Sequence, residues 1–121
     1  MSHAHMEQIS PEMQACISIC HECHDSCLTT LHHCLHMGGE HASPHHIGLL
    51  QDCAQICHTS EDFMLRQSEF HASVCGVCAE ICDHCAQECE TMANGDAQML
   101  ACAATCRRCA ESCRRMANMV M

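Results

Sequence analysis

The cysteine spacing in Cys78-Ala-Glu-Ile-Cys82-Asp-His-Cys85-Ala-Gln-Glu-Cys89 carries the strongest structural signal in this chain, and Cys75 extends it upstream. The cysteines recur at intervals of four, three and four residues. Residues three and four apart are neighbours on one face of an α-helix. The spacing therefore predicts a helix with a cysteine stripe along one side.

The same C-x3-C-x2-C-x3-C pattern occurs twice more, and a fourth copy is shortened. The two further copies comprise Cys16, Cys20, Cys23 and Cys27, and Cys102, Cys106, Cys109 and Cys113. The shortened copy has Cys53 and Cys57, with Ser60 where a third cysteine would fall. Four stripes predict four amphipathic helices that enclose a thiol-lined interior.

Cap and turn residues predict where these helices begin and end. Ser-Pro pairs suit helix starts, Gly-Gly suits a helix end, and Asn-Gly suits a turn. The predicted helices run from Ser10-Pro11 to Gly38-Gly39, from Ser43-Pro44 to about Gln67, over roughly 70–92, and from Asp96 to about 118. Short connections imply antiparallel neighbours, so we predict an all-α, up-down-up-down four-helix bundle over residues 10–121. Residues 1–9 are predicted to form a flexible N-terminal tail.

Composition excludes several classes of protein. A buried, protonated Cys packs as a small hydrophobe, so sixteen cysteines in 121 residues can supply much of a core. The net charge of −10 argues against a nucleic-acid partner, which requires a basic surface. No apolar run approaches the ~20 residues of a membrane span, so we expect no membrane partner. The N-terminus lacks the basic and apolar regions of a secretory signal, which predicts a cytoplasmic protein with reduced thiols.

Three familiar uses of cysteine fit this pattern poorly. In a disulfide scaffold the Cβ atoms of a bridged pair converge to ~3.8 Å, whereas cysteines on one helix face diverge. Structural zinc sites gather ligand pairs from knuckles and loops rather than from continuous helices. A redox enzyme usually carries one activated cysteine pair at a helix N-terminus, and no pair is singled out here.

Charge favours Cu(I) as the metal. Four tetrathiolate zinc ions would neutralise only half of the charge on sixteen thiolates, and uncompensated buried charge is costly. About one Cu(I) ion per thiolate would leave the core near neutral. Cu(I) is also soft and favours thiolate and thioether ligands.

Histidine and methionine gather at one predicted end of the bundle, beside the first connection and the Asn94-Gly95 turn. Six histidines fall within fifteen residues there: His32, His33, His36, His41, His45 and His46. Met37, Met92 and Met99 join them. We interpret this end as a mouth that attracts metal, with His36, His46, Met37, Met92 and Met99 as candidate accessory ligands.

These features together resemble the bacterial four-helix-bundle copper storage proteins, and the missing export signal resembles their cytosolic branch. The resemblance covers about residues 12–116 and rests on three full copies of the motif. It implies a tetramer of bundles that stores many Cu(I) ions through cysteine thiolates. By position, the implied ligands are Cys16, Cys20, Cys23, Cys27, Cys34, Cys53, Cys57, Cys75, Cys78, Cys82, Cys85, Cys89, Cys102, Cys106, Cys109 and Cys113. Helix two departs from the pattern, since only Cys53 and Cys57 match.

The expected function is metal storage without catalytic turnover, and we assign no catalytic residue. The alternative is a redox or metal-transfer protein that hands electrons or a soft metal to a partner. Storage predicts high capacity, whereas transfer predicts one or two exposed, labile sites. Leu49, Ile56 and Phe63 recur every seven residues off the cysteine stripe and either seal neighbouring helices or contribute to an oligomer contact.

Overall fold

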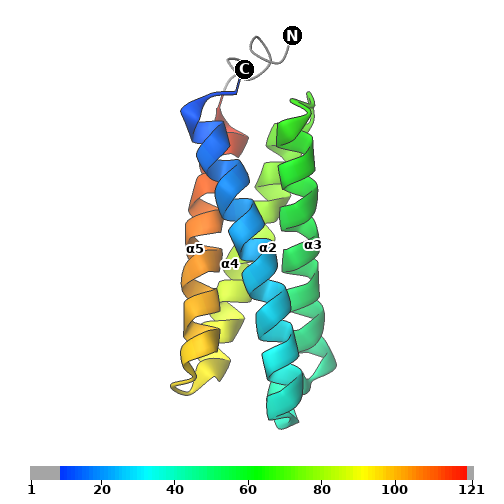
Figure 1. Cartoon of the computed structure of the whole chain (residues 1–121), viewed down its shortest axis with the longest axis vertical. Coiled ribbons are helices and arrows are strands. Elements are labelled where there is room, and N and C mark those ends of the chain that lie inside the picture. The colour runs from blue at the N-terminus through cyan, green and yellow to red at the C-terminus, as the bar shows by residue number, and fades with distance from the viewer. Residues whose placement is uncertain (1–8, 120–121) are drawn as a thin grey trace.

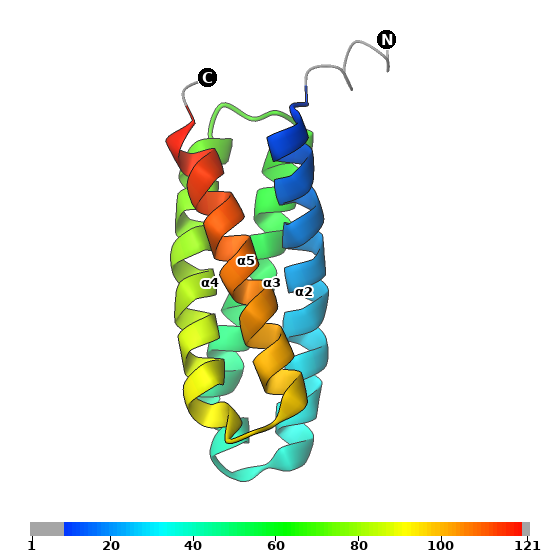
Figure 2. The same cartoon turned by 90° about the vertical axis from the view of Figure 1, so that its left-hand side faces the viewer.

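Four long helices form an antiparallel bundle in the computed structural model, which describes residues 9–119 (Figure 1). The helices are α2 (Pro11–Met37), α3 (Pro44–Leu65), α4 (His71–Ala93) and α5 (Ala97–Asn118), with the short 3-10 helix η1 (Gly39–Ala42) between α2 and α3. Each helix packs against two others, and α5 closes the bundle beside α2 (Figure 2). This arrangement confirms the predicted fold class. Nearly all of the predicted tail, residues 1–8, lies outside the described residues.

The three predicted N-caps all form. In each, the cap side chain accepts a hydrogen bond from the backbone N–H three residues later, which satisfies one of the unpaired donors of a helix start. The bonds run from Met13 to Ser10 (3.1 Å), from His46 to Ser43 (3.2 Å) and from Met99 to Asp96 (2.9 Å). Local sequence thus determines the starts of α2, α3 and α5.

The connection between α3 and α4 differs from the prediction. Helix α3 ends at Leu65, two residues before Gln67, and Gln67 takes a left-handed conformation with φ of +53°. The N–H of Ser68 donates to the Phe63 carbonyl, and the N–H of Gln67 donates to the Met64 carbonyl. This pair of bonds is a Schellman motif, with glutamine at the position that glycine usually occupies.

Cysteine fills the core. All sixteen cysteines are buried, with at most 1% of each residue exposed. Four methionines, Met13, Met64, Met99 and Met116, are buried as well. Leu49 and Ile56 are half-buried and pack against this core, which is the arrangement expected of side chains that seal neighbouring helices.

Among residues 9–119, no helix is apolar enough over its length to cross a bilayer.

Candidate metal centre

Thiols from all four helices meet in one continuous row inside the bundle. Successive Sγ atoms in the row lie 3.5–4.0 Å apart. The row links, in order, Cys16, Cys113, Cys20, Cys109, Cys57, Cys82, Cys53, Cys23, Cys106, Cys27 and Cys102. Every step in the row crosses from one helix to another, and the step from Cys109 to Cys57 joins α5 to α3 across the interior of the bundle.

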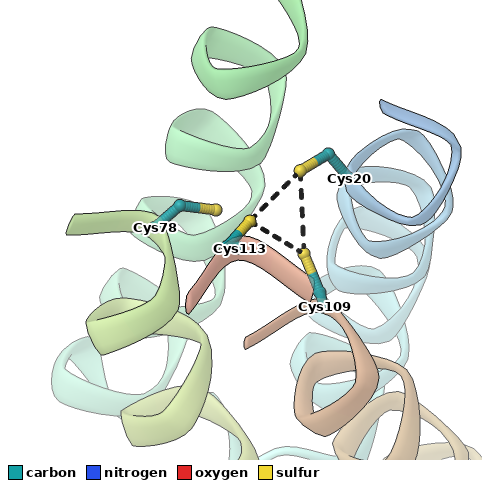
Figure 3. Close-up of side chains that lie close together, drawn as sticks. All are labelled: Cys20, Cys78, Cys109 and Cys113. Carbon is teal, nitrogen blue, oxygen red and sulfur yellow. Dashed lines mark hydrogen bonds between the residues drawn. The ribbon is translucent and has the colours of Figure 1, made fainter. Parts of the chain in front are cut away.

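Figure 3 shows how one part of the row is assembled. Cys20 of α2, Cys78 of α4, and Cys109 and Cys113 of α5 direct their sulfur atoms toward one another. The Sγ atom of Cys20 lies 3.5 Å from that of Cys113 and 3.8 Å from that of Cys109. Cys109 and Cys113 are 4.0 Å apart on successive turns of one helix. Spacing along a single helix and proximity between helices therefore both bring thiols within reach of one ion.

Five such groups bring three or four ligand atoms within 4.8 Å of one another. They are Cys20/Cys78/Cys109/Cys113, Cys57/Cys78/Cys82/Cys109, Cys23/Cys53/Cys57/Cys82, Cys23/Cys27/Cys53/Cys106 and Cys16/Cys75/Cys113. Neighbouring groups share members, as Cys53 and Cys113 illustrate. Shared thiols suit bridged metal ions in a chain better than separate tetrahedral sites.

Four cysteines, Cys34, Cys85, Cys89 and Cys102, lie outside these groups, toward the end of the bundle that carries η1. Cys102 is nevertheless the last member of the row, since its Sγ lies 4.0 Å from that of Cys27. Cys34 instead pairs with His46, whose Nε2 is 3.4 Å from the thiol sulfur. Buried Thr30 and Leu50 occupy the stripe positions between this pair and the row.

Neighbouring thiols affect each other's ionisation. Contacts from the Cys106 thiol and other nearby thiols lower the pKa of Cys23, because they stabilise its thiolate. Contacts with Cys109 and other neighbours, together with burial, raise the pKa of Cys57. A thiolate in the row thus depends on neighbours that stay protonated. Ionising the whole row requires cations between the sulfur atoms.

The Cys34–His46 pair is set for neutral forms of both side chains. Burial, with a smaller contribution from the nearby Asp96 carboxylate, raises the pKa of Cys34 to about 11. Burial lowers the pKa of His46 despite the opposing effect of Glu88. A neutral imidazole can bind a metal ion without first losing a proton.

The five accessory ligands predicted at the mouth lie at different depths. His46 and Met99 are fully buried, whereas Met92 is partly buried. His36 and Met37 are exposed, and the ring centroid of His36 lies 4.7 Å from that of His32. The structure therefore brings two of the five into the core and leaves two on the surface.

At the opposite end of the bundle, the stripes end in three methionines and one histidine, where the spacing of the sequence also places them. They are Met13, Met64, His71 and Met116, and each is at least 96% buried. His71 lies four residues before Cys75 on the same helix face, so it continues the cysteine stripe of α4.

Three comparisons with known proteins agree with this geometry. The copper storage protein family matches residues 5–118. The crystal structure of the Nmul_A1745 protein from Nitrosospira multiformis is similar, with a TM-score of 0.82 and 50% identity over 88% of this chain and 94% of that one. The Cu(I)-bound copper storage protein BsCsp3 gives a TM-score of 0.81 and 35% identity over 88% and 98% of the two chains.

A curated relative comes from Bacillus subtilis. It is an uncharacterised cysteine-rich protein, YhjQ, 38% identical over 75 residues that span 62% of this chain and 67% of the relative. The family match covers nearly the whole bundle, including every cysteine of the row and the Cys34–His46 pair. With its four thiol-lined helices and this match, the chain belongs to the copper storage protein family.

Proposed function

We propose that this protein stores many Cu(I) ions along the bundle core through its cysteine thiolates. The observation that carries the proposal is the continuous row of buried thiols, in which successive groups share members. Cu(I) accepts two or three soft ligands, so adjacent thiolates can bridge ions without a change in the backbone. The Cu(I)-bound relative BsCsp3, with the same overall fold, supports this choice of metal.

Two other uses of the row agree less well with its geometry. Disulfide bonds need an S–S distance of about 2.05 Å, whereas the closest thiols here are 3.5 Å apart and all sixteen are free. Separate tetrathiolate zinc sites need ligand sets that do not overlap, and the sets here do. Zinc would also leave much of the thiolate charge uncompensated.

The end of the bundle near η1 is our candidate for the mouth through which copper passes. Exposed His36 and Met37 and partly buried Met92 would form its outer part, and buried His46 and Met99 its inner part. These neutral ligands would pass a cation inward to Cys34 and then to the row, since His46 already contacts the Cys34 thiol. The gradation in depth from His36 to His46 supports this order.

We also propose that the bundle works as a cytoplasmic homotetramer and performs no catalytic step. The family resemblance supports the tetramer, and Leu28 and Leu35, exposed seven residues apart on α2, offer an apolar contact surface. A reducing compartment suits sixteen free thiols. A monomeric mass in light scattering at micromolar concentration would argue against the tetramer.

Anaerobic titration of the reduced protein with Cu(I) tests the storage function. We expect about one ion per cysteine, on the order of sixteen per chain, with close to one proton released for each cysteine used. Saturation of the unmodified protein at four ions or fewer would contradict storage and favour the metal-transfer alternative.

A matched pair of variants on α3 shows whether the thiols of the row hold the metal. Cys53→Ser removes a thiol that two of the groups share, so it should lower the number of ions bound. Thr59→Ser changes a partly buried side chain of the same helix that belongs to neither group, and it should leave the capacity unchanged. Equal capacities in the two variants would argue against Cys53 as a ligand.

A further inference from the structure

The end of the bundle opposite the proposed mouth holds a buried histidine whose outer nitrogen lacks a partner. His71 is 4% exposed, and its Nε2 has no hydrogen-bond partner among the described residues. Buried polar atoms of native proteins are nearly always paired, so an exception calls for a partner such as a water or an ion, or for a functional role. His71 Nε2 is therefore a candidate ligand atom.

The other ring nitrogen fixes the form of this imidazole. Nδ1 lies 2.8 Å from the backbone carbonyl oxygen of Ser68, so it carries the proton and donates to that oxygen. In this tautomer Nε2 presents a free lone pair. Metal-binding histidines are typically oriented in this way, by a hydrogen bond from the nitrogen that does not bind the metal.

The residues that close this end of the other three helices are soft ligands. Met13, Met64 and Met116 lie one helical turn beyond the last cysteine or serine of their stripes and are buried, as His71 is. The start of α2, the end of α3, the start of α4 and the end of α5 all meet at this end (Figures 1 and 2). Three thioethers and one imidazole therefore close the same end of the thiol row.

This layer is distinct from the nearest thiolate group. Cys16, Cys75 and Cys113 form that group, and His71 does not belong to it. Two more buried polar atoms near the same end, Ser60 Oγ and Gln67 Nε2, also lack partners among residues 9–119. An oxygen or an amide nitrogen is a poor ligand for Cu(I), so the imidazole and the thioethers are the relevant donors.

We propose that this layer is a terminal site for one soft monovalent cation, Cu(I) or Ag(I), bound by His71 Nε2 and by methionine sulfur. The inference rests on the proposed storage of Cu(I) in the neighbouring row. All ligands of this site are neutral, so an ion bound here releases no proton, unlike an ion bound by the thiols. The site therefore lies at the end of the thiolate row and binds a cation through neutral ligands, which add no negative charge to the core.

Nuclear magnetic resonance of the full-length reduced chain tests the site directly. The protein carries ¹⁵N-histidine and methyl-labelled methionine, and Cu(I) is added anaerobically in steps to saturation. We expect the Nε2 resonance of His71 and the methyl resonance of at least one of Met13, Met64 and Met116 to shift at the same equivalent. Exposed His58 and Met119 are the matched controls and should stay unchanged. Proton release per copper should drop below one during that same step.

The outcomes separate this site from the storage proposal. An unchanged His71 resonance at saturation, with about sixteen ions bound, would overturn the terminal site and leave storage intact. Few ions bound together with a shifted His71 resonance would support the site and contradict storage. The His71→Ala variant should bind one ion fewer per chain than the His58→Ala variant. If His71→Ala fails to fold, the resonance measurement on the labelled, unmodified chain still tests the site.

Discussion

Cys34 differs from the other cysteines in its partner, which is an imidazole nitrogen 3.4 Å away. Its raised pKa, about 11 against an ordinary value of 9.0, means that the folded state retains the thiol proton more strongly than the unfolded state. The stabilisation from this neutral thiol is complete below pH 9 and is lost as the pH rises toward 11. The pair is therefore a local source of alkaline sensitivity in the metal-free protein.

This linkage predicts the behaviour of Cys34→Ser. Between about pH 8 and pH 11 the free energy of unfolding of the reduced apoprotein should fall, and the variant should lose less over that range. The difference should not exceed about 2 kcal/mol. Denaturant titrations followed by circular dichroism at both pH values measure it. Equal losses in the two proteins would show that Cys34 does not hold its proton more tightly when folded.

The mouth histidines allow a kinetic prediction. Replacing both His36 and His46 with Ala should slow the loading or removal of Cu(I) several-fold, because the outer and inner neutral ligands are lost together. Final capacity should remain nearly unchanged, since the thiol row is intact. Stopped-flow loading of the double variant, with exposed His58→Ala as the control, measures the effect. Unaltered rates would mean that this end is ordinary surface.

The sequence predicted the face of each side chain better than its depth. Helical periodicity placed every cysteine in the core, and all sixteen are buried there. It also placed His36 and Met37 at the mouth, but it could not show that they are exposed while His46 is buried. The burial of a side chain near a helix end depends on how far the neighbouring helix extends. The residue spacing along one helix does not reveal the length of its neighbour.

Among the elements, α5 is tied to α2 through its own N-cap. Asp96 accepts the N–H of Met99, and both of its carboxylate oxygens lie near His33 Nε2, at 3.1 and 2.9 Å. Both contacts lower the pKa of the Asp96 carboxyl group, and the hydrogen bond from Met99 contributes more than the contact with His33. One side chain thus starts a helix and joins it to the last turns of another.

Three variants separate these two roles. Asp96→Ala should lower the Tm by roughly 5 °C, because it removes the cap and the contact with His33. Asp96→Asn keeps a cap acceptor and should lose less, and His33→Ala removes only the link between helices. Thermal unfolding of the reduced apoprotein at neutral pH compares them. A Tm for Asp96→Ala within about one degree of the unmodified protein would show that the cap contributes little.

Local sequence is sufficient to predict some of the helix boundaries and not others. Ser10, Ser43 and Asp96 are cap residues that could be recognised in the sequence, and each makes its expected bond. Gln67 could not be recognised, because a glutamine with positive φ is uncommon and has no sequence signal. The bundle imposes this conformation where α3 must reverse direction into α4.

For the whole molecule, the main question is whether the bundle folds before it binds metal. Neutral thiols pack as small hydrophobes, and the capped helices enclose them completely. We therefore expect the reduced, metal-free protein to be helical, with copper adding stability by binding the native state preferentially. Circular dichroism of the apoprotein checks this. A coil-like spectrum that becomes helical only with Cu(I) would show that the metal drives folding.

The contact between Cys16 and Cys113 has a mechanical consequence. Their sulfur atoms are 3.6 Å apart although the residues are separated by 97 positions in the chain. An ion that bridges them closes almost the whole polypeptide into a loop, and for a disulfide a loop of this size corresponds to about 4.7 kcal/mol in the chain-entropy model. Loaded copper would act as a cross-link between the first and last helices that a chelator can open and a reductant cannot. If the two ends of the chain were pulled apart, this cross-link would have to break before α2 could separate from α5.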